Sequence, residues 1–200
     1  MSHLRYSGRP FDEQRQALET IVRAEPVLMA VLSGARAMAL PDSWLVSGAL
    51  YNSVWNALTE RPPMTGVKDA DLFYFDASDV SYAAEDAVIR RGEGVFAGLP
   101  VPVEIRNQAR VHLWYEEHFG VPYAPLADSR EAIRRFASLT HAVGMRLDED
   151  DGLELYAPYG LDDVFSFRPV PNRLMDNRKT HEEKAARQMR IWPELTLEPW

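Results

Sequence analysis

The sequence predicts a single α+β domain in which a mixed β-sheet is flanked by helices, with a hairpin and a further helix near the C-terminus. Three observations support this class. Apolar residues recur at helical spacing through most of the first 40 residues. A short apolar segment, a turn of small residues and a helical segment follow one another over residues 44–58. Two alternating segments flank the Asp-Asp-Gly turn at 150–152, which is typical of a β-hairpin.

Composition limits the functions that are open to the chain. Its 200 residues, 46% of them hydrophobic, suffice for one well-buried domain. The formal charge of −8 argues against extended nucleic-acid binding, which needs a basic face. The lack of cysteine excludes disulfides, a thiol nucleophile and a zinc–thiolate site. No signal-peptide pattern or apolar segment of 18 residues is present, so we expect a cytoplasmic protein without a membrane partner.

The N-terminal half begins with helices. Asp12 and Glu13 favour a helix start, and the apolar stripe that follows ends before Pro26. Pro26 suits the first turn of a second helix, which we expect to run to Leu40. The apolar strand at 44–46 then leads through small residues at 47–49 into a helix. Small residues at such a turn allow the backbone to approach a phosphate, and the free N–H groups of the helix start attract anions.

The segment 67–75 is predicted to be the strand around which the site is built. Asp69 and Asp71 alternate along it and would face the same way, roughly 6–7 Å apart. Two carboxylates so placed repel unless a cation lies between them or one is protonated. Oxygen ligands alone suit Mg²⁺ or Mn²⁺. The alternative is that Asp69 caps a loop and Asp71 is solvated.

A third acid is expected on a following strand. We predict a helix from about 80 to Arg90, a loop at 92–94, and an edge strand at 99–106 that begins with prolines. Alternation puts Glu104 and Arg106 on the face opposite the core, and a neighbouring strand lies about 5 Å away. Glu104 therefore completes a set of three carboxylates. Arg106 and Arg110 either contact phosphate or pair with surplus acids, and the spacing leaves both open.

The remaining elements complete the domain. Asp128 and Glu131 have the spacing that begins a helix, which we expect to continue to Gly144. The hairpin follows, then a short helix at 160–165 and a charged helix at 178–190.

Four segments, 47–55, 68–76, 104–114 and 157–163, together resemble a family of small bacterial nucleotidyltransferase-like proteins. The resemblance implies a catalytic core at 41–115, with residues 116–200 as C-terminal helices and a hairpin packed on it. It implies that Asp69, Asp71 and Glu104 are catalytic and hold the metal. Residues implied to bind nucleotide are Ser47, Gly48, Ala49, Asn52, Lys68, Arg106, Asn107 and Arg110. Two features depart from the wider superfamily: Ala49 replaces a second Gly or Ser, and the interval from Gly48 to Asp69 is long.

The leading hypothesis is a nucleotidyltransferase that uses Mg²⁺ or Mn²⁺ to move a nucleoside monophosphate from a nucleoside triphosphate to an unknown hydroxyl acceptor. One alternative is a module of the same fold that binds a nucleotide or a partner without turnover, which Ala49 favours. A less favoured alternative is a metal-dependent glycosyltransferase. We expect the three carboxylates to converge on one point, and Gly48 to lie at a strand-to-helix turn that opens onto the same cleft.

Overall fold

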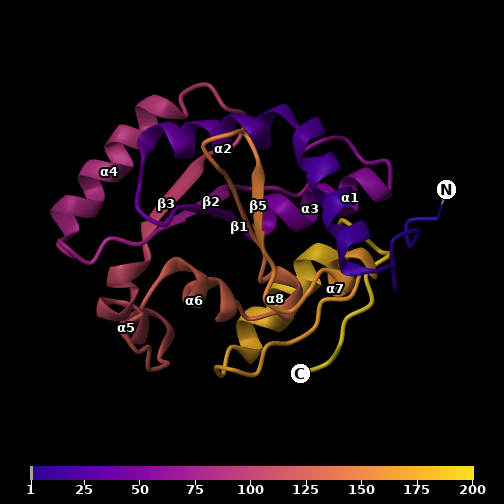
Figure 1. Ribbon diagram of the computed structural model, residues 1–200. Coiled ribbons are helices and arrows are strands. Elements are labelled where there is room, and N and C mark those ends of the chain that lie inside the picture. The colour runs from indigo at the N-terminus through magenta and orange to yellow at the C-terminus, as the bar shows by residue number, and fades with distance from the viewer. Residues whose placement is uncertain (1) are drawn as a thin grey trace.

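The computed structural model describes residues 2–200 and shows a mixed five-stranded sheet between two layers of helices (Figure 1). The strands are β1 (Trp44–Val46), β2 (Ala70–Tyr74), β3 (Val103–Asn107), β4 (Gly144–Leu147) and β5 (Leu153–Tyr156). The helices are α1 (Phe11–Ala24), α2 (Pro26–Met38), α3 (Gly48–Leu58), α4 (Tyr82–Val95), α5 (Tyr115–Phe119), α6 (Ser129–Arg134), α7 (Asp162–Phe165) and α8 (Arg178–Met189), with 3-10 helices η1 (Gln108–Leu113) and η2 (Leu139–His141). This arrangement confirms the predicted α+β class.

The strand order is β3-β2-β1-β4-β5. Among the strands of residues 2–200, only β2 and β3 pair in parallel, and the helix α4 provides the crossover between them. The predicted hairpin is β4–β5, which pairs with β1 and so extends the same sheet. As its prolines indicated, β3 lies at an edge, where the backbone needs hydrogen-bond partners on one side only.

The two faces of the sheet are covered differently. In Figure 1, α2 and α4 arch over one side, while α5, α6 and α8 lie on the other. The first side holds the main core, in which Leu45, Leu72 and Ile105 pack against α1 to α4. A smaller cluster on the second side joins Trp44 and Val46 to Ile133 of α6. This second side also carries Asp71, because Asp71 pairs in register with Val46 and paired residues share a face.

The predicted loop at residues 92–94 is wrong, because α4 continues through both glycines to Val95. Gly92 lies against Ile105 of β3: a Cβ atom at residue 92 would overlap with the Ile105 Cδ1 atom. Glycine therefore lets the helix approach the edge strand closely, and tertiary packing outweighs its poor helix propensity. The helix begins at Tyr82 and is capped by Ser81, whereas Asp76 and Asp79 accept bonds within the preceding turns.

Two other boundaries differ from expectation. The Asp128 side chain caps α6 as predicted, but the helix ends at Arg134 instead of reaching Gly144. The next residues form η2 and a bridge between Ser138 and Pro171, and Gly144 already belongs to β4. The strand β2 is also shorter than predicted, so Asp69 lies immediately before it. Across residues 2–200, no helix combines the length and the apolar character needed to cross a membrane.

The two glycines of α4 give a matched test of this packing. No atom lies within 4 Å of a Cβ built on Gly94, so Gly94→Ala should stabilise the protein by a few tenths to about 1 kcal/mol through helix propensity. Gly92→Ala should instead destabilise it by about 1–3 kcal/mol, because Ile105 must move within a filled core. Urea unfolding of both variants measures the difference. Equal stabilisation by both would show that the close approach is not required.

Candidate functional site

The parallel pairing of β2 with β3 brings two of the predicted acids side by side. Asp71 is the register partner of Glu104, and Phe73 is the partner of Arg106. Paired residues of neighbouring strands point to the same face, so both pairs lie on the second side of the sheet. Asp69 precedes the strand and is close enough for its charge to act on Asp71. The alternation expected for Asp71 and Glu104 is therefore present in the fold.

Asp71 occupies an environment that disfavours its charge. The pKa of its carboxyl is raised from 3.8 to about 6, mainly by burial and to a smaller extent by the charges of Asp69 and Glu104. The charge of Lys184 opposes this rise most strongly and that of Arg106 more weakly. An ionised carboxylate at this position would be stabilised by any cation that enters the site.

Glu104 lies at the open edge of this group. Its side chain is 46% exposed, and it forms an ion pair with Arg106 at 3.5 Å. Within residues 2–200, no three Asp, Glu, His or Cys side chains are arranged so that they could hold a metal ion. The expected convergence of three carboxylates on one point is thus absent from the side-chain arrangement, although the strands place Asp71 and Glu104 next to each other.

The turn from β1 into α3 has the predicted form. Gly48 is the first residue of α3, and it lines the same cavity as Asp69 and Asp71, which confirms the expectation for this turn. Ser47 is held at φ 56° and ψ −114°, a conformation that residues other than glycine rarely adopt. Such strain costs about 1–3 kcal/mol and is concentrated at functional sites. Ala49 is fully buried in the main core and does not line the cavity. A serine hydroxyl at this position would therefore not contact a ligand in the cavity.

A polar cavity of about 300 Å³ lies beside Asp71, between α3 and α8. Three of the predicted nucleotide-binding residues, Gly48, Asn52 and Lys68, line it with Asp69 and Asp71. The opposite wall is formed by α8 and the residues after it: Lys184, Arg187, Gln188, Ile191 and Trp192. The cavity therefore combines two carboxylates with three cationic side chains.

The contribution of α8 was missed from the sequence. Lys184, Arg187 and Gln188 are spaced i, i+3 and i+4, so they share one helix face. Gln188 is also buried, which is unusual for its type. The shared helix face of these three residues could have indicated a functional helix from the sequence. The spacing alone does not show which part of the fold this face contacts.

Unpaired polar atoms gather beside this cavity. Within residues 2–200, the buried side-chain atoms without a hydrogen-bond partner include Ser47 Oγ, Asn52 Oδ1 and Gln188 Oε1. The amide of Gln188 donates to the hydroxyl of Tyr51 at 2.8 Å. Buried polar groups are normally paired, so these atoms indicate a place where water or a ligand supplies the missing partner.

A neutral histidine packs against Tyr51, which lines the cavity. His141 is buried and stacks on Tyr51 with ring centroids 4.6 Å apart. Burial lowers its pKa well below the ordinary value, and the charge of Lys184 lowers it further. Its imidazole therefore remains uncharged at neutral pH and adds no positive charge near Lys184.

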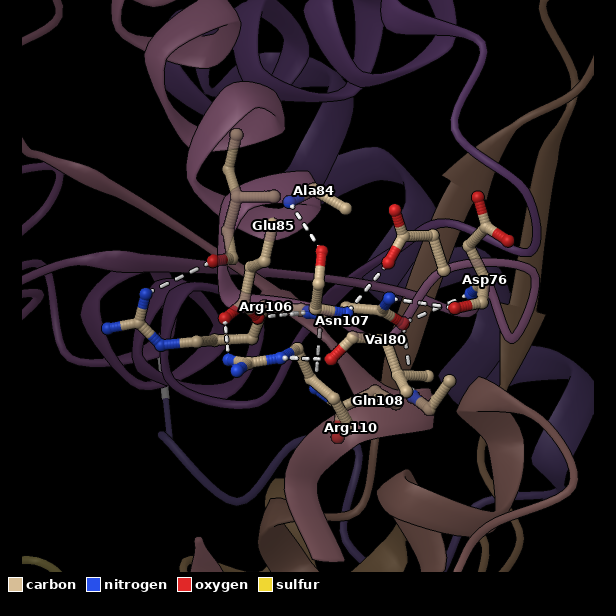
Figure 2. Close-up of polar contacts among 12 residues, drawn as sticks. Asp76, Val80, Ala84, Glu85, Arg106, Asn107, Gln108 and Arg110 are labelled. Carbon is tan, nitrogen blue, oxygen red and sulfur yellow. Dashed lines mark hydrogen bonds and ion pairs between the residues drawn. The ribbon is translucent and has the colours of Figure 1, made fainter. Parts of the chain in front are cut away.

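Asn107 and Arg110 do not reach the polar cavity. Asn107 lies on the opposite face of β3 from Arg106, and its side chain bonds the backbone of Asp76 in both directions. Arg110 forms a buried ion pair with Glu85 of α4 and donates to the carbonyl of Val80. Figure 2 shows these contacts as one polar network. Their side-chain donors contact Asp76, Val80 and Glu85, so the structure does not bring these two residues together with the acids of the cavity.

The fold and the cavity together define a class of protein. An NMR structure described as revealing a CCA-adding enzyme head domain aligns with a TM-score of 0.71 and 30% sequence identity. The match covers 92% of this chain and 96% of that one. No relative is found among curated proteins. The class defined by this likeness is the nucleotidyltransferase fold.

A family model described as nucleotidyltransferase matches residues 33–197. The chain therefore belongs to this nucleotidyltransferase family. The match includes the turn at Gly48, all three predicted acids and the whole of α8.

The half-buried Asp71 gives a pH-dependent prediction. Its folded-state pKa lies above the ordinary value of 3.8, so the unfolded chain loses this proton first and stability falls as pH rises from about 4 to 6. Asp71→Asn should remove that loss. Without divalent cations, the variant should be more stable than the native protein above pH 6.5 by about 1–3 kcal/mol, with the difference vanishing near pH 4.

Asp76→Asn provides a control of opposite sign. Hydrogen bonds from Ser78 lower the pKa of Asp76, so its charge stabilises the fold above the ordinary pKa and this contribution is lost as pH falls. Urea unfolding from pH 4 to 8 compares the variants. If Asp71→Asn lowers stability across this range, Asp71 is a satisfied structural acceptor and the interpretation is wrong.

Proposed function

We propose that the protein transfers a nucleoside monophosphate from a nucleoside triphosphate to a hydroxyl acceptor with the help of Mg²⁺ or Mn²⁺. The observation that carries the proposal is the polar cavity, in which Asp69 and Asp71 face the first turn of α3 and the cations of α8. A polyphosphate needs both hydrogen-bond donors and positive charge, and its divalent counter-ion needs carboxylate oxygens.

Each wall of the cavity has a distinct role in this proposal. The N–H groups at the start of α3 would bind an anion, and Gly48 leaves room for the backbone to approach a phosphate. Lys184, Arg187 and Lys68 supply positive charge to the β- and γ-phosphates. This charge also favours the departure of pyrophosphate, since negative charge accumulates on it as the bond breaks.

The acidic wall fits a hard divalent cation. Asp69, Asp71 and Glu104 offer only oxygen donors, and the raised pKa of Asp71 indicates an environment that a cation would relieve. These three residues would hold the metal once Glu104 turns from Arg106. When bound, the metal would neutralise phosphate charge and activate the acceptor hydroxyl.

The proposed transfer needs no reactant besides the nucleoside triphosphate and the hydroxyl acceptor. The acceptor oxygen forms a bond to the α-phosphorus, and the bond from that phosphorus to the bridging oxygen of pyrophosphate breaks. The hydroxyl proton passes to solvent. In-line attack requires the acceptor to approach from the side opposite the phosphates held by α8.

Pyrophosphate release tests the proposal directly. The purified protein is incubated with each of the four ribonucleoside triphosphates, Mg²⁺ or Mn²⁺, and a panel of hydroxyl acceptors. We expect release with at least one combination and none in the presence of EDTA. Asp71→Asn should reduce kcat on the order of a hundredfold or more. Lys184→Gln should weaken triphosphate binding about tenfold, because a charge-assisted contact is lost.

Lys179→Gln is the matched control. Lys179 lies on the same helix, its side chain is 87% exposed, and it does not line the cavity. Its substitution should leave both parameters unchanged. Nucleotide binding without turnover under every condition would favour the non-catalytic module, while metal-dependent cleavage of a nucleotide sugar would favour the glycosyltransferase.

A further inference from the structure

A second hollow, of about 200 Å³, lies next to the acidic site and differs from it in chemistry. Its walls come from β2, β3, η1, α5, the segment after α5, α6 with the residues after it, and the start of α8. Six of its lining residues are aromatic: Phe73, Trp114, Tyr115, Phe119, Tyr123 and Phe136. We call it the aromatic pocket. None of the residues proposed to hold the metal lines it.

The strand register fixes this pocket relative to the acids. Phe73 follows Asp71 by two residues and therefore faces the same side of the sheet, roughly 6–7 Å further along the strand. Arg106 lines the pocket and also forms the ion pair with Glu104. The aromatic pocket thus begins where the acidic group ends.

The polar cavity extends from Asp71 toward α8 and contains neither Phe73 nor Arg106. The aromatic pocket contains both of these residues. The acids consequently lie between a cationic compartment and an apolar one.

The walls of the pocket suit a flat ring. Phe73 and Phe136 are nearly parallel, with an interplanar angle of 17°, and the rings of Tyr115 and Tyr123 lie 4.2 Å apart. Burial raises the pKa of Tyr123 to about 12, which indicates a poorly hydrated interior. Aromatic faces of this kind bind planar heteroaromatic rings by stacking.

The few polar groups of the pocket contact these aromatic rings or lie next to them. Asn177 accepts a bond from the Tyr115 hydroxyl at 3.3 Å, and Gln108 and Thr180 also line the hollow. The guanidinium of Arg135 lies 4.8 Å from the centre of the Tyr123 ring. An apolar hollow with a small number of hydrogen-bonding side chains recognises a ring that has polar atoms along its edge.

We propose that the aromatic pocket binds the nucleobase of the donor nucleotide, while its phosphates occupy the polar cavity. This inference rests on the proposed function. A nucleoside triphosphate is one molecule with a polyanionic end and a flat heteroaromatic end. The two compartments on either side of the acids match these ends and place the α-phosphate at the carboxylates. The lining residues Phe136 and Tyr123 belong to segments remote from the acids in sequence.

The experiment separates base recognition from phosphate recognition. Calorimetry in the presence of Mg²⁺ compares each ribonucleoside triphosphate with ribose 5-triphosphate, which lacks a base. The native protein should bind at least one nucleotide about tenfold or more tightly than ribose 5-triphosphate. Phe136→Leu and Tyr123→Leu should remove most of that difference and leave the affinity for ribose 5-triphosphate unchanged, because leucine keeps the site apolar but has no aromatic face.

Phe11→Leu is the control for the substitution itself, since Phe11 is 45% exposed on α1 and outside the pocket. Thermal unfolding verifies that each variant is folded, and the use of two pocket variants protects the test if one is not. Equal affinity for the nucleotides and ribose 5-triphosphate would show that the aromatic pocket does not bind the nucleobase. The same conclusion would follow if the pocket variants weakened only acceptor binding. Neither result would contradict the proposed function. A lack of binding by every triphosphate would overturn both.

Discussion

The parallel pairing of β2 with β3 is the constraint on which the site depends. It sets Asp71 beside Glu104 and Phe73 beside Arg106, and so gives one face of the sheet an acidic end and an aromatic end. A shift of one residue in this register would turn both side chains of β3 to the other face. Like charges on adjacent strands oppose this arrangement, hence the surrounding structure must hold it in place.

The polar network around Asn107 provides that support. Asn107 bonds the backbone after β2, and Glu85 of α4 accepts from the Asn107 backbone as well as from Arg110. The carboxyl ends of β2 and β3 are thereby joined to each other, and that of β3 is tied to the crossover helix. Removing one member of a buried ion pair leaves an uncompensated charge, so these residues are expected to be sensitive to substitution without touching a ligand. Close packing of Gly92 against Ile105 fixes the same helix from its other end.

Local patterns were sufficient for the part of the site that lies on neighbouring segments. The small-residue turn at Gly48, the paired aspartates and the alternation that exposes Glu104 all follow from periodicity and residue type. The contacts of Asn107 and Arg110 were not predicted, because proximity in sequence does not reveal that Asp76 and Glu85 are their hydrogen-bond partners.

The remaining parts depend on tertiary structure. Lys184 and Arg187 are more than 100 residues from Asp71 in the chain, and only the packing of α8 against α3 brings them to the cavity. The aromatic pocket likewise joins β2 to residues after 113. A loop was predicted at Gly92 because helix propensity depends on the residue type and does not include the packing of Gly92 against Ile105.

Paramagnetic broadening by Mn²⁺ tests the central claim most directly, since it locates the cation without requiring an acceptor. In two-dimensional NMR spectra at substoichiometric Mn²⁺, the backbone amide signals of Asp69, Asp71 and Glu104 should broaden first, with Gly48 next. Asp71→Asn should abolish this pattern. Broadening strongest at the acidic turn 148–151, or unchanged in Asp71→Asn, would contradict a metal site at the carboxylates of β2 and β3.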